Sequence, residues 1–471
     1  MRRVFLATAT VAAGLALPAA AEAHGLVGKA DLPIPMWLFI WAAAAVLVIS
    51  FAAIGLLWSR PLLAEERFRP LPGALSRALT SRVTEVVCGA IGFALLVGVL
   101  LCGFFGTQLA TQNVTPTFVY VAFWLGLVPV SVLFGDVFRA FNPWRAAGRF
   151  VGWILRSSGT EPLPYPARLG YYPAALGLLA FAALELISAR GDRPATIATA
   201  AAIYSVVTWI AMATYGVEAW SRRGEAFGVY FGLFARLSPV EVRGRQVGLR
   251  RPLSGLAHLA PEAGIVALVM VMIGTVTFDG LSAGPTWLSA TREPIGTLID
   301  AGLKPRYSVE LVYALGMTAI VLVIIGLYRL AIAGVHTVDG RRPARELARL
   351  FAPSMVPIAL AYAAAHYVSL LLFQGQMILP LASDPAGQGW DLLGMADGDI
   401  DYSFISPETF WYIQAALVVG GHVAALALAH DRGLELYGSG RRAARSQRWM
   451  LGVMVIFTVL ALWLLSEAAE G

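Results

Sequence analysis

The stretch from Met36 to Trp58 reads MWLFIWAAAAVLVISFAAIGLLW and contains no charged side chain. A run of about 20 apolar residues is long enough for a helix to cross the hydrocarbon core of a bilayer. Comparable apolar stretches recur along the rest of the chain. We therefore predict an all-α, polytopic integral membrane protein with about ten transmembrane helices, at residues 36–58, 83–105, 117–135, 170–188, 194–216, 260–280, 308–334, 352–379, 408–430 and 447–466.

The composition supports this fold class. Of the 471 residues, 58% are hydrophobic and 14% are charged, whereas soluble domains have roughly 45–50% apolar and about 25% charged residues. This difference excludes a water-soluble enzyme, a disordered protein and a nucleic-acid-binding module. The net charge of +6 is therefore not a sign of nucleic-acid binding. The two cysteines, Cys88 and Cys102, exclude a disulfide scaffold.

The N-terminus has the layout of a secretory signal peptide. Arg2 and Arg3 precede an apolar run, and Ala21-Glu22-Ala23 matches an A-x-A cleavage site. We predict that residues 1–23 are removed and that 24–471 form a single transmembrane domain. Cleavage would leave His24 as the first residue, whose free amine and imidazole can together chelate Cu(II). The alternative is that His24 merely marks the cleavage position.

The arginines and lysines predict the orientation of the spans. Cytoplasmic loops of membrane proteins are enriched in these residues, and here the basic residues fall in every second loop. The most basic loop, 217–259, contains Arg222, Arg223, Arg236, Arg243, Arg245, Arg250 and Arg251. The alternate loops together contain only Lys29, Arg190, Arg193, Arg292, Lys304 and Arg306.

This alternation predicts that the mature N-terminus and the C-terminus both lie outside the cell. The preference for arginine over lysine is typical of a GC-rich bacterial genome, so we expect a bacterial cell membrane. The partners we expect are the lipid bilayer, with anionic lipids against the arginine-rich inner face, and a small molecule that the sequence does not identify. We expect no nucleic acid.

Three further segments are predicted at the inner surface. The apolar patch from Phe227 to Leu237 lies inside the basic loop 217–259 and predicts an interfacial helix. Trp144 and Trp153 predict a second interfacial segment around 143–155. The sequence His430-Asp431-Arg432 is predicted to close the ninth span at the inner surface, where a cation suits the C-terminal end of a helix.

Two histidines are predicted deep inside spans. His366 lies midway along 352–379 and His422 midway along 408–430. Consecutive antiparallel helices are usually neighbours, so we expect the two rings near each other and at nearly the same depth. Three hypotheses stay open: the pair ligates a divalent transition metal or a haem, it relays protons or binds a substrate, or each ring hydrogen-bonds a neighbouring helix.

The loop 380–407 is strongly acidic and lacks lysine and arginine. Asp397, Asp399 and Asp401 alternate, and Glu408 stands where the twelfth position of an EF-hand calcium loop would be. Tyr402 occupies the position where that loop needs glycine. The alternative is a solvated acidic loop kept outside the cell by the topology. Asp384 and Asp391 complete the acidic set and are weaker candidates for catalysis.

Eight short strings carry a resemblance to a known family. They are 23–28 (AHGLVG), 31–35 (DLPIP), 134–137 (FGDV), 141–145 (FNPWR), 383–385 (SDP), 389–391 (GWD), 421–423 (GHV) and 428–432 (LAHDR). Together they resemble a bacterial, largely actinobacterial, family of multi-spanning membrane proteins labelled fenitrothion hydrolase, and the likeness extends over most of the chain. The resemblance implies hydrolysis of an organophosphorus phosphotriester, in which a bound metal would activate water and polarise the phosphoryl oxygen.

Three functions therefore compete. The first is a membrane-embedded phosphotriester hydrolase, which the resemblance implies. The second is a transporter of a metal ion or small solute that uses His366 and His422 at mid-membrane. The third is a redox subunit that carries haem or metal. The candidate site residues are His366 and His422, then His24, then Asp384 and Asp391. The sequence contains no Walker loop and no H-E-x-x-H motif.

Overall fold

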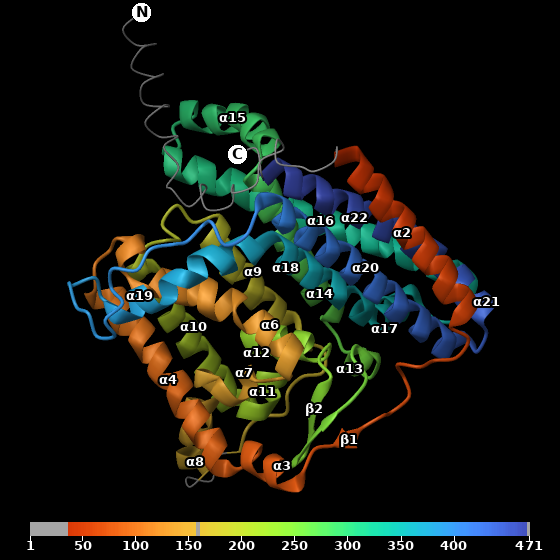
Figure 1. Ribbon diagram of the computed structural model, residues 1–471, viewed down its shortest axis with the longest axis horizontal. Helices are drawn as coiled ribbons and strands as arrows, with labels where there is room; N and C mark the ends of the chain where they lie inside the picture. The colour runs from red at the N-terminus through yellow and green to blue at the C-terminus, as the bar shows by residue number, and fades with distance from the viewer. Residues whose placement is uncertain (1–35, 157–160, 469–471) are drawn as a thin grey trace, which may run out of the picture.

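The computed structural model describes residues 36–156 and 161–468 (Figure 1). The predicted signal peptide and the candidate copper ligand His24 lie outside the described residues.

The described chain is almost entirely helical. Its first half contains α2 (Met36–Leu57), α3 (Gly73–Leu79), α4 (Arg82–Phe105), α5 (Val114–Pro116), a π-helix (Thr117–Leu125), α6 (Leu127–Phe134), α7 (Phe138–Phe141), α8 (Pro143–Arg156), α9 (Tyr172–Leu186), α10 (Pro194–Tyr215), α11 (Val217–Arg223) and α12 (Ala226–Ala235). Its second half contains α13 (Ser254–Ala257), α14 (Ile265–Ser282), α15 (Pro285–Asp300), α16 (Pro305–Asp339), α17 (Ala344–Phe351), α18 (Val356–Phe373), α19 (Ile378–Ser383), α20 (Pro407–Tyr437), α21 (Gly440–Ser446) and α22 (Arg448–Ala468).

Within the described residues, nine helical segments are long and apolar enough to cross a membrane. They correspond to nine of the ten predicted spans, so the all-α, polytopic fold class is confirmed. The remaining predicted span, 170–188, is the shorter apolar helix α9, of 15 residues. It still connects the two ends of the bundle, because Tyr171 bonds to Ala263 before α14 and Ala189 bonds to Glu310 near the start of α16.

The helices form two groups that share one interface (Figure 1). In the first group, α4 packs against α7, α8 and α10, while α12 packs against α6 and α9. In the second, α14, α16, α18, α20 and α22 pack together and α2 lies against α20 and α22. The helix α9 packs against α14 and so joins the groups.

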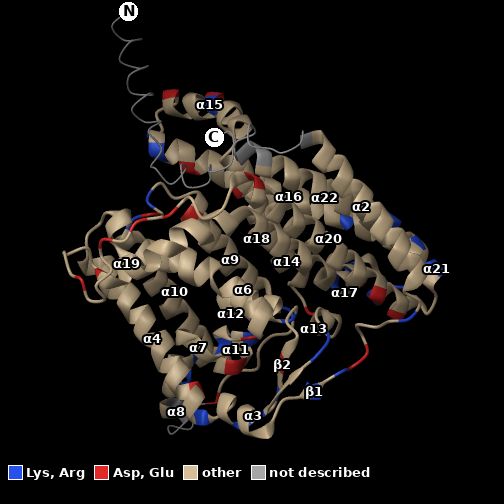
Figure 2. Ribbon diagram, viewed as in Figure 1, with Lys and Arg blue, Asp and Glu red and all other residues tan. Residues whose placement is uncertain are grey.

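A small sheet is the exception to the helical fold. Three antiparallel strands, β1 (Arg69–Pro70), β3 (Gln246–Leu249) and β2 (Val240–Arg243), lie in that order. Gly244, with φ of +60°, supplies the left-handed residue between β2 and β3. Figure 2 shows arginines around this sheet, α3 and α8, and acidic residues in the loop after α19 at the other end. The loops that are rich in arginine thus lie at one end of the helix bundle, and the acidic loop lies at the other end.

The prediction of an interfacial helix at 227–237 is wrong. In α12, Phe227, Tyr230, Phe231 and Phe234 are all buried inside the protein. The reason is that apolar residues cover every side of this short helix, so it has no polar face for water or headgroups. The predicted interfacial segment 143–155 corresponds to α8, whose Trp144 is buried and whose Phe150 is exposed.

The predicted closure of a span at His430-Asp431-Arg432 is also wrong, because α20 continues to Tyr437. The Asp431 carboxylate instead accepts hydrogen bonds from Trp58 Nε1 and from the backbone N–H groups of Leu62, Leu63 and Ala64. This buried carboxylate therefore anchors the segment that follows α2.

Candidate functional site

A cavity of about 380 Å³ lies between α4, the π-helix, α7, α8, α9, α10 and α12. Its walls combine small residues with a large number of aromatic rings. The aromatic rings are those of Phe118, Phe123, Phe138, Phe141, Trp144, Phe181, Tyr204 and Phe227.

The rings hold one another in fixed orientations. Phe227 lies edge-on to Phe123, with centroids 4.9 Å apart, and stacks on Trp144 at 5.7 Å. Trp144 in turn meets Tyr204 edge-on at 4.9 Å. Edge-to-face and offset-stacked rings are the favoured arrangements of aromatic pairs, so these walls form a rigid, preorganised surface.

Glycines set the width of the cavity. A Cβ atom on Gly92 of α4 would lie 1.7 Å from the carbonyl oxygen of Phe141, and one on Gly177 of α9 would lie 2.8 Å from the Cβ of Ala226. Glycine at these positions allows α7 and α12 to approach the long helices. Any larger residue would push these walls apart.

The lining contains only two polar side chains, and both use their donors elsewhere. Trp144 Nε1 donates to Ser205 Oγ at 2.8 Å. The Tyr204 hydroxyl donates to Glu225 Oε1 at 2.6 Å and accepts from the backbone N–H of Ala226 at 3.0 Å. The side chains of the lining therefore offer an occupant apolar contact and no free hydrogen-bond donor.

Glu225 is completely buried behind Tyr204. Besides the Tyr204 hydroxyl, its carboxylate accepts hydrogen bonds from Asn142 Nδ2 at 2.8 Å, Phe227 N at 2.9 Å and Gly228 N at 2.7 Å. The last two are unpaired N–H groups at the start of α12, so Glu225 is the N-cap of that helix. Burial raises the pKa of this carboxyl group, and the four hydrogen bonds oppose that shift.

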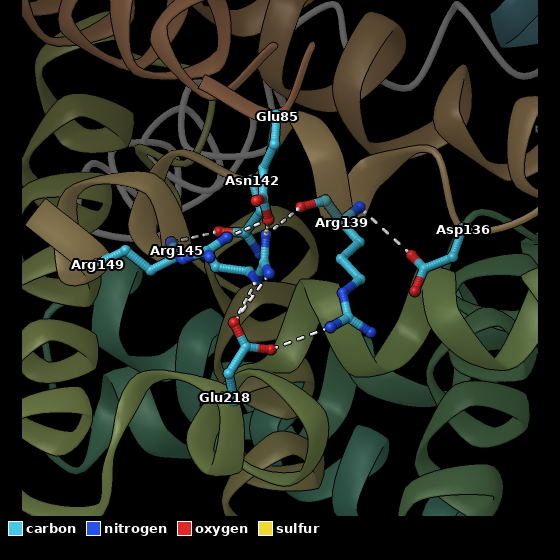
Figure 3. Close-up of polar contacts among 7 residues, drawn as sticks. All are labelled: Glu85, Asp136, Arg139, Asn142, Arg145, Arg149 and Glu218. Atoms are coloured by element: carbon cyan, nitrogen blue, oxygen red, sulfur yellow. Dashed lines mark hydrogen bonds and ion pairs between the residues drawn. The ribbon is translucent and has the colours of Figure 1, made fainter. Parts of the chain in front are cut away.

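Through Asn142, Arg145 connects this carboxylate to the charged end of the molecule. Figure 3 shows Arg145 with Asn142, Glu85 and Glu218. Its guanidinium, which is 8% exposed, bonds to Glu218 Oε1 at 2.8 Å and to Glu85 Oε1 at 2.8 Å. Its backbone N–H donates to Asn142 Oδ1, and the other end of the Asn142 amide donates to Glu225.

The rim of this network is more exposed. Arg149 pairs with Glu85, and Arg139 bonds to Glu218 Oε2 at 3.0 Å. The Asp136 carboxylate accepts from the backbone N–H of Arg139 (Figure 3). The segment 141–145 therefore links five helices and lies directly beneath the cavity.

His366 forms a buried pair with an acid on another helix. Its Nε2 lies 3.0 Å from Asp279 Oδ2 of α14, and Tyr367 also hydrogen-bonds to Asp279. The His366 and Tyr367 rings are 4.7 Å apart. The two side chains of the pair are only 7% and 8% exposed, so it is a buried polar contact that joins α14 to α18.

His422 does not share the depth of His366, contrary to the prediction. Gln414 of α20 donates to the carbonyl of Ala365, so Gln414 lies level with His366. Gly421 lies against Ala361, closer to the start of α18. The depths differ because of the register between the two helices: Gln414 meets Ala365, and the His422 ring lies beside Tyr362, with centroids 6.2 Å apart.

The His422 ring is completely buried, and its Nδ1 bonds to Val418 O of the same helix at 2.8 Å. Among the described residues, no three or more His, Cys, Asp or Glu side chains gather where they could hold a metal ion. His366 and His422 thus contact different partners, Asp279 and the carbonyl of Val418, and their ligation of one metal or haem stays a prediction.

The acidic loop uses its carboxylates to hold its own backbone. Asp384 accepts from Gln388 N and Gly389 N, and Asp391 accepts from Ser383 Oγ at 2.6 Å and Met395 N at 2.8 Å. The hydrogen bond from Ser383 lowers the pKa of Asp391, with help from the backbone of Ala396. These contacts give both carboxylates a structural role.

The EF-hand hypothesis lacks its structural frame. Asp397, Asp399 and Asp401 are exposed, and no helix enters the loop in the described segment 384–396. Asp401 accepts from Ser403 N at 2.7 Å, while Glu408 lies in the first turn of α20. An EF-hand needs a helix on both sides of its loop, so the arrangement favours the alternative of a solvated acidic loop.

Sequence reasoning missed the cavity and its polar floor. Asn142 and Arg145 enter the sequence argument only through the string 141–145, and Tyr204, Glu225 and Asp279 are not among its candidate residues. A signal was present for two of them: Glu225 directly precedes an apolar run of helix length, and Asp279 is the single charge in the apolar stretch 265–282. Comparisons with models of protein families, with curated proteins and with solved structures found no match to this chain.

Proposed function

We propose that this membrane protein binds an uncharged, mostly apolar small molecule in the cavity between α4, α9, α10 and α12. The supporting observation is the lining, which is aromatic and aliphatic and keeps its two polar side chains engaged elsewhere. A charged occupant would lose its hydration there without gaining a partner. The volume of about 380 Å³ lies within the range of small-molecule pockets.

Hydrolysis of an organophosphorus phosphotriester is the reaction that we propose from the family resemblance. A phosphotriester carries no net charge, and an aryl ester group suits an aromatic wall, so this substrate class agrees with the cavity. The Glu225 carboxylate is already bonded to four donors, so its contacts support a role in holding α12 rather than in accepting a proton.

The placement of the protein is part of this proposal. We propose a bacterial cell membrane, with the arginine-rich end that contains α3 and α8 on the cytoplasmic side and a cleaved signal peptide before residue 24. The positive-inside rule supports this orientation. Fusion of a reporter enzyme after residue 468, which is active only outside the cytoplasm, tests it. An inactive reporter would overturn the orientation.

Binding can be tested in nanodiscs with an uncharged 4-nitrophenyl phosphotriester, because a nitroaromatic group quenches tryptophan fluorescence. Trp144 lines the cavity, so we expect quenching that saturates. Ala201→Phe places a ring in the cavity and should abolish the saturable part. Ile203→Phe on the exposed side of α10 is the matched control and should behave as the wild type. Purely linear quenching of the wild type would overturn the proposal.

The reaction is measured as nitrophenol release from washed membranes, with and without a chelator. Release that Ala201→Phe abolishes would assign hydrolysis to the cavity. Release that instead disappears in His366→Ala and with the chelator would assign a metal-dependent reaction to α18. Saturable binding without release would leave a binding or transport function, and a Soret band in the purified protein would favour the redox subunit.

A further inference from the structure

The cavity lies at mid-depth along its helices. Leu95 of α4 is 13 residues from Arg82 and 10 from Phe105, which corresponds to roughly 20 and 15 Å of helix. Ala200 and Ala201 lie 6 and 7 residues after Pro194, the first residue of α10, and Gly177 lies within α9. The cavity is therefore level with the hydrocarbon core of the bilayer rather than with the headgroups.

Close helix contacts close the cavity toward both ends of α4. Toward the charged end, Gly92 lies against Phe141 and Gly89 lies against Ala146. Toward the other end, a Cβ on Gly103 would lie 2.5 Å from the Cβ of Ala198. Neither end of α4 leaves room for a side chain, and still less for a ligand.

The ion-paired side chains at the charged end form a second barrier. Arg145 belongs to the segment 141–145, which lines the cavity at this end, and its guanidinium pairs with Glu85 and Glu218. An apolar molecule arriving from water on that side would have to separate these ion pairs. The same route would bring it past Asn142, whose amide is bonded at both ends.

Leu95 lies where the cavity meets the exposed side of α4. It lines the cavity and yet is 46% exposed. Its neighbour one turn earlier on α4, Ile91, is 47% exposed and does not line the cavity. Because α4 is one of the helices apolar enough to cross the membrane, its exposed apolar face borders the lipid chains.

We infer that the cavity takes up its ligand sideways from the hydrocarbon core of the bilayer, past Leu95. This inference rests on the proposed function, and it narrows the ligand class to uncharged aromatic molecules that dissolve in the membrane. A ligand that enters from the lipid is already out of water, so the hydrophobic effect contributes nothing to its binding free energy. The aromatic walls then select among molecules already concentrated in the bilayer.

Spin labelling tests the route without a ligand. A nitroxide is attached to Ala201→Cys in a chain with Cys88→Ala and Cys102→Ala, in liposomes. Collisions with oxygen, which concentrates in hydrocarbon, are compared with collisions with a water-soluble nickel chelate. We expect strong oxygen and weak nickel contact, as for a control label on Ile203→Cys. Nickel contact equal to that of a label on the exposed Arg149→Cys would overturn the inference.

The proposed entrance at Leu95 is tested by adding Leu95→Trp or Ile91→Trp to the labelled chain. Leu95→Trp should lower oxygen collisions at position 201 several-fold, and Ile91→Trp should leave them unchanged. Equal effects would show that Leu95 is not the entrance. If a labelled chain does not fold, transfer of the bound phosphotriester to empty vesicles gives the same comparison, with slower release expected only for Leu95→Trp.

The two proposals fail separately. If the wild type shows no saturable quenching by the phosphotriester but the label at 201 contacts oxygen and not nickel, the proposed ligand class is wrong and the lateral route stands. If quenching saturates while nickel reaches position 201, the binding function stands and the ligand enters from water.

Discussion

The hydroxyl of Tyr204 donates to the buried carboxylate of Glu225 across 2.6 Å, so one residue belongs both to the wall of the cavity and to the N-cap of α12. The same oxygen accepts from the backbone N–H of Ala226. The packing of α12 is thereby tied directly to the cavity wall. The polar groups at this wall stabilise the shape of the cavity, while its apolar surface contacts the occupant.

Tyr204→Phe should destabilise the protein without closing the cavity. The change removes a hydrogen bond to a charged group, which contributes about 1.5–3 kcal/mol, and it leaves Ala226 N without its acceptor. The ring that faces the cavity stays. We expect a lower midpoint of thermal unfolding and nearly unchanged phosphotriester affinity. Tyr172→Phe, at an exposed tyrosine of α9, should change neither quantity. Loss of binding with unchanged stability would contradict the structural role of the hydroxyl.

Gly92→Ala should distort the floor of the cavity. The new Cβ would overlap the Phe141 carbonyl oxygen, and overpacking of this kind costs about 1–3 kcal/mol. We expect a lower unfolding midpoint and weaker saturable quenching. Gly98→Ala is the matched control on the same helix, because no atom lies within 4 Å of its Cβ position. If both variants behave alike, the contact between α4 and Phe141 does not determine the cavity.

Arg145→Met should lower the free energy of unfolding far more than Arg139→Ala, which removes another arginine of the same ion-pair network. The guanidinium of Arg145 is 8% exposed, and removing one partner of a buried ion pair costs about 3–5 kcal/mol. Its two acids are partly exposed, so we expect the lower end of that range, about 3 kcal/mol. Arg139→Ala breaks an exposed pair and should cost about 0–1 kcal/mol. Thermal unfolding of the two variants measures the difference, and equal destabilisation would contradict it.

The cavity should prefer aromatic ligands over saturated ones of the same size. Aromatic pairs contribute about 0.5–1.5 kcal/mol beyond the area they bury, which corresponds to about 2- to 10-fold in affinity. A phenyl phosphotriester should therefore displace the nitrophenyl probe at a lower membrane concentration than its cyclohexyl analogue. The comparison must use concentrations in the bilayer, which partition measurements supply. Equal displacement by the two analogues would show that the aromatic rings of the cavity wall contribute only apolar contact area.

The acidic loop should lose its folded structure as the pH falls, and it should do so at a higher pH when Ser383 is replaced. Hydrogen bonds lower the pKa of Asp391, so they stabilise the folded loop above the unfolded pKa of about 3.9 and are lost as the pH falls through the lowered value. Ser383→Ala removes the largest contribution and raises that pKa. Pepsin should then cleave 384–401 at a higher pH than in the wild type. Ser289→Ala on α15 is the control, and identical cleavage profiles would contradict the prediction.

The candidate site could be predicted only in part. The aromatic residues of the cavity are visible in the sequence, but they come from several helices, the π-helix through α12, and nothing local indicates that they surround one space. His366 and His422 were recognisable as deep histidines. Their different depths follow from the contacts of Gln414 with Ala365 and of Gly421 with Ala361, which depend on packing between helices.

The sequence by itself determined the fold class, because hydropathy along a helix is a local property and a bilayer accepts only segments whose backbone groups bond internally. It also determined which loops are basic. Only the tertiary structure decided that α12 lies buried rather than at the membrane surface, that His366 pairs with Asp279 rather than with His422, and that Arg145, Asn142, Glu225 and Tyr204 connect in series. Those outcomes depend on which side chains meet across distant segments, and contacts of that kind depend on the rotation and register of packed helices.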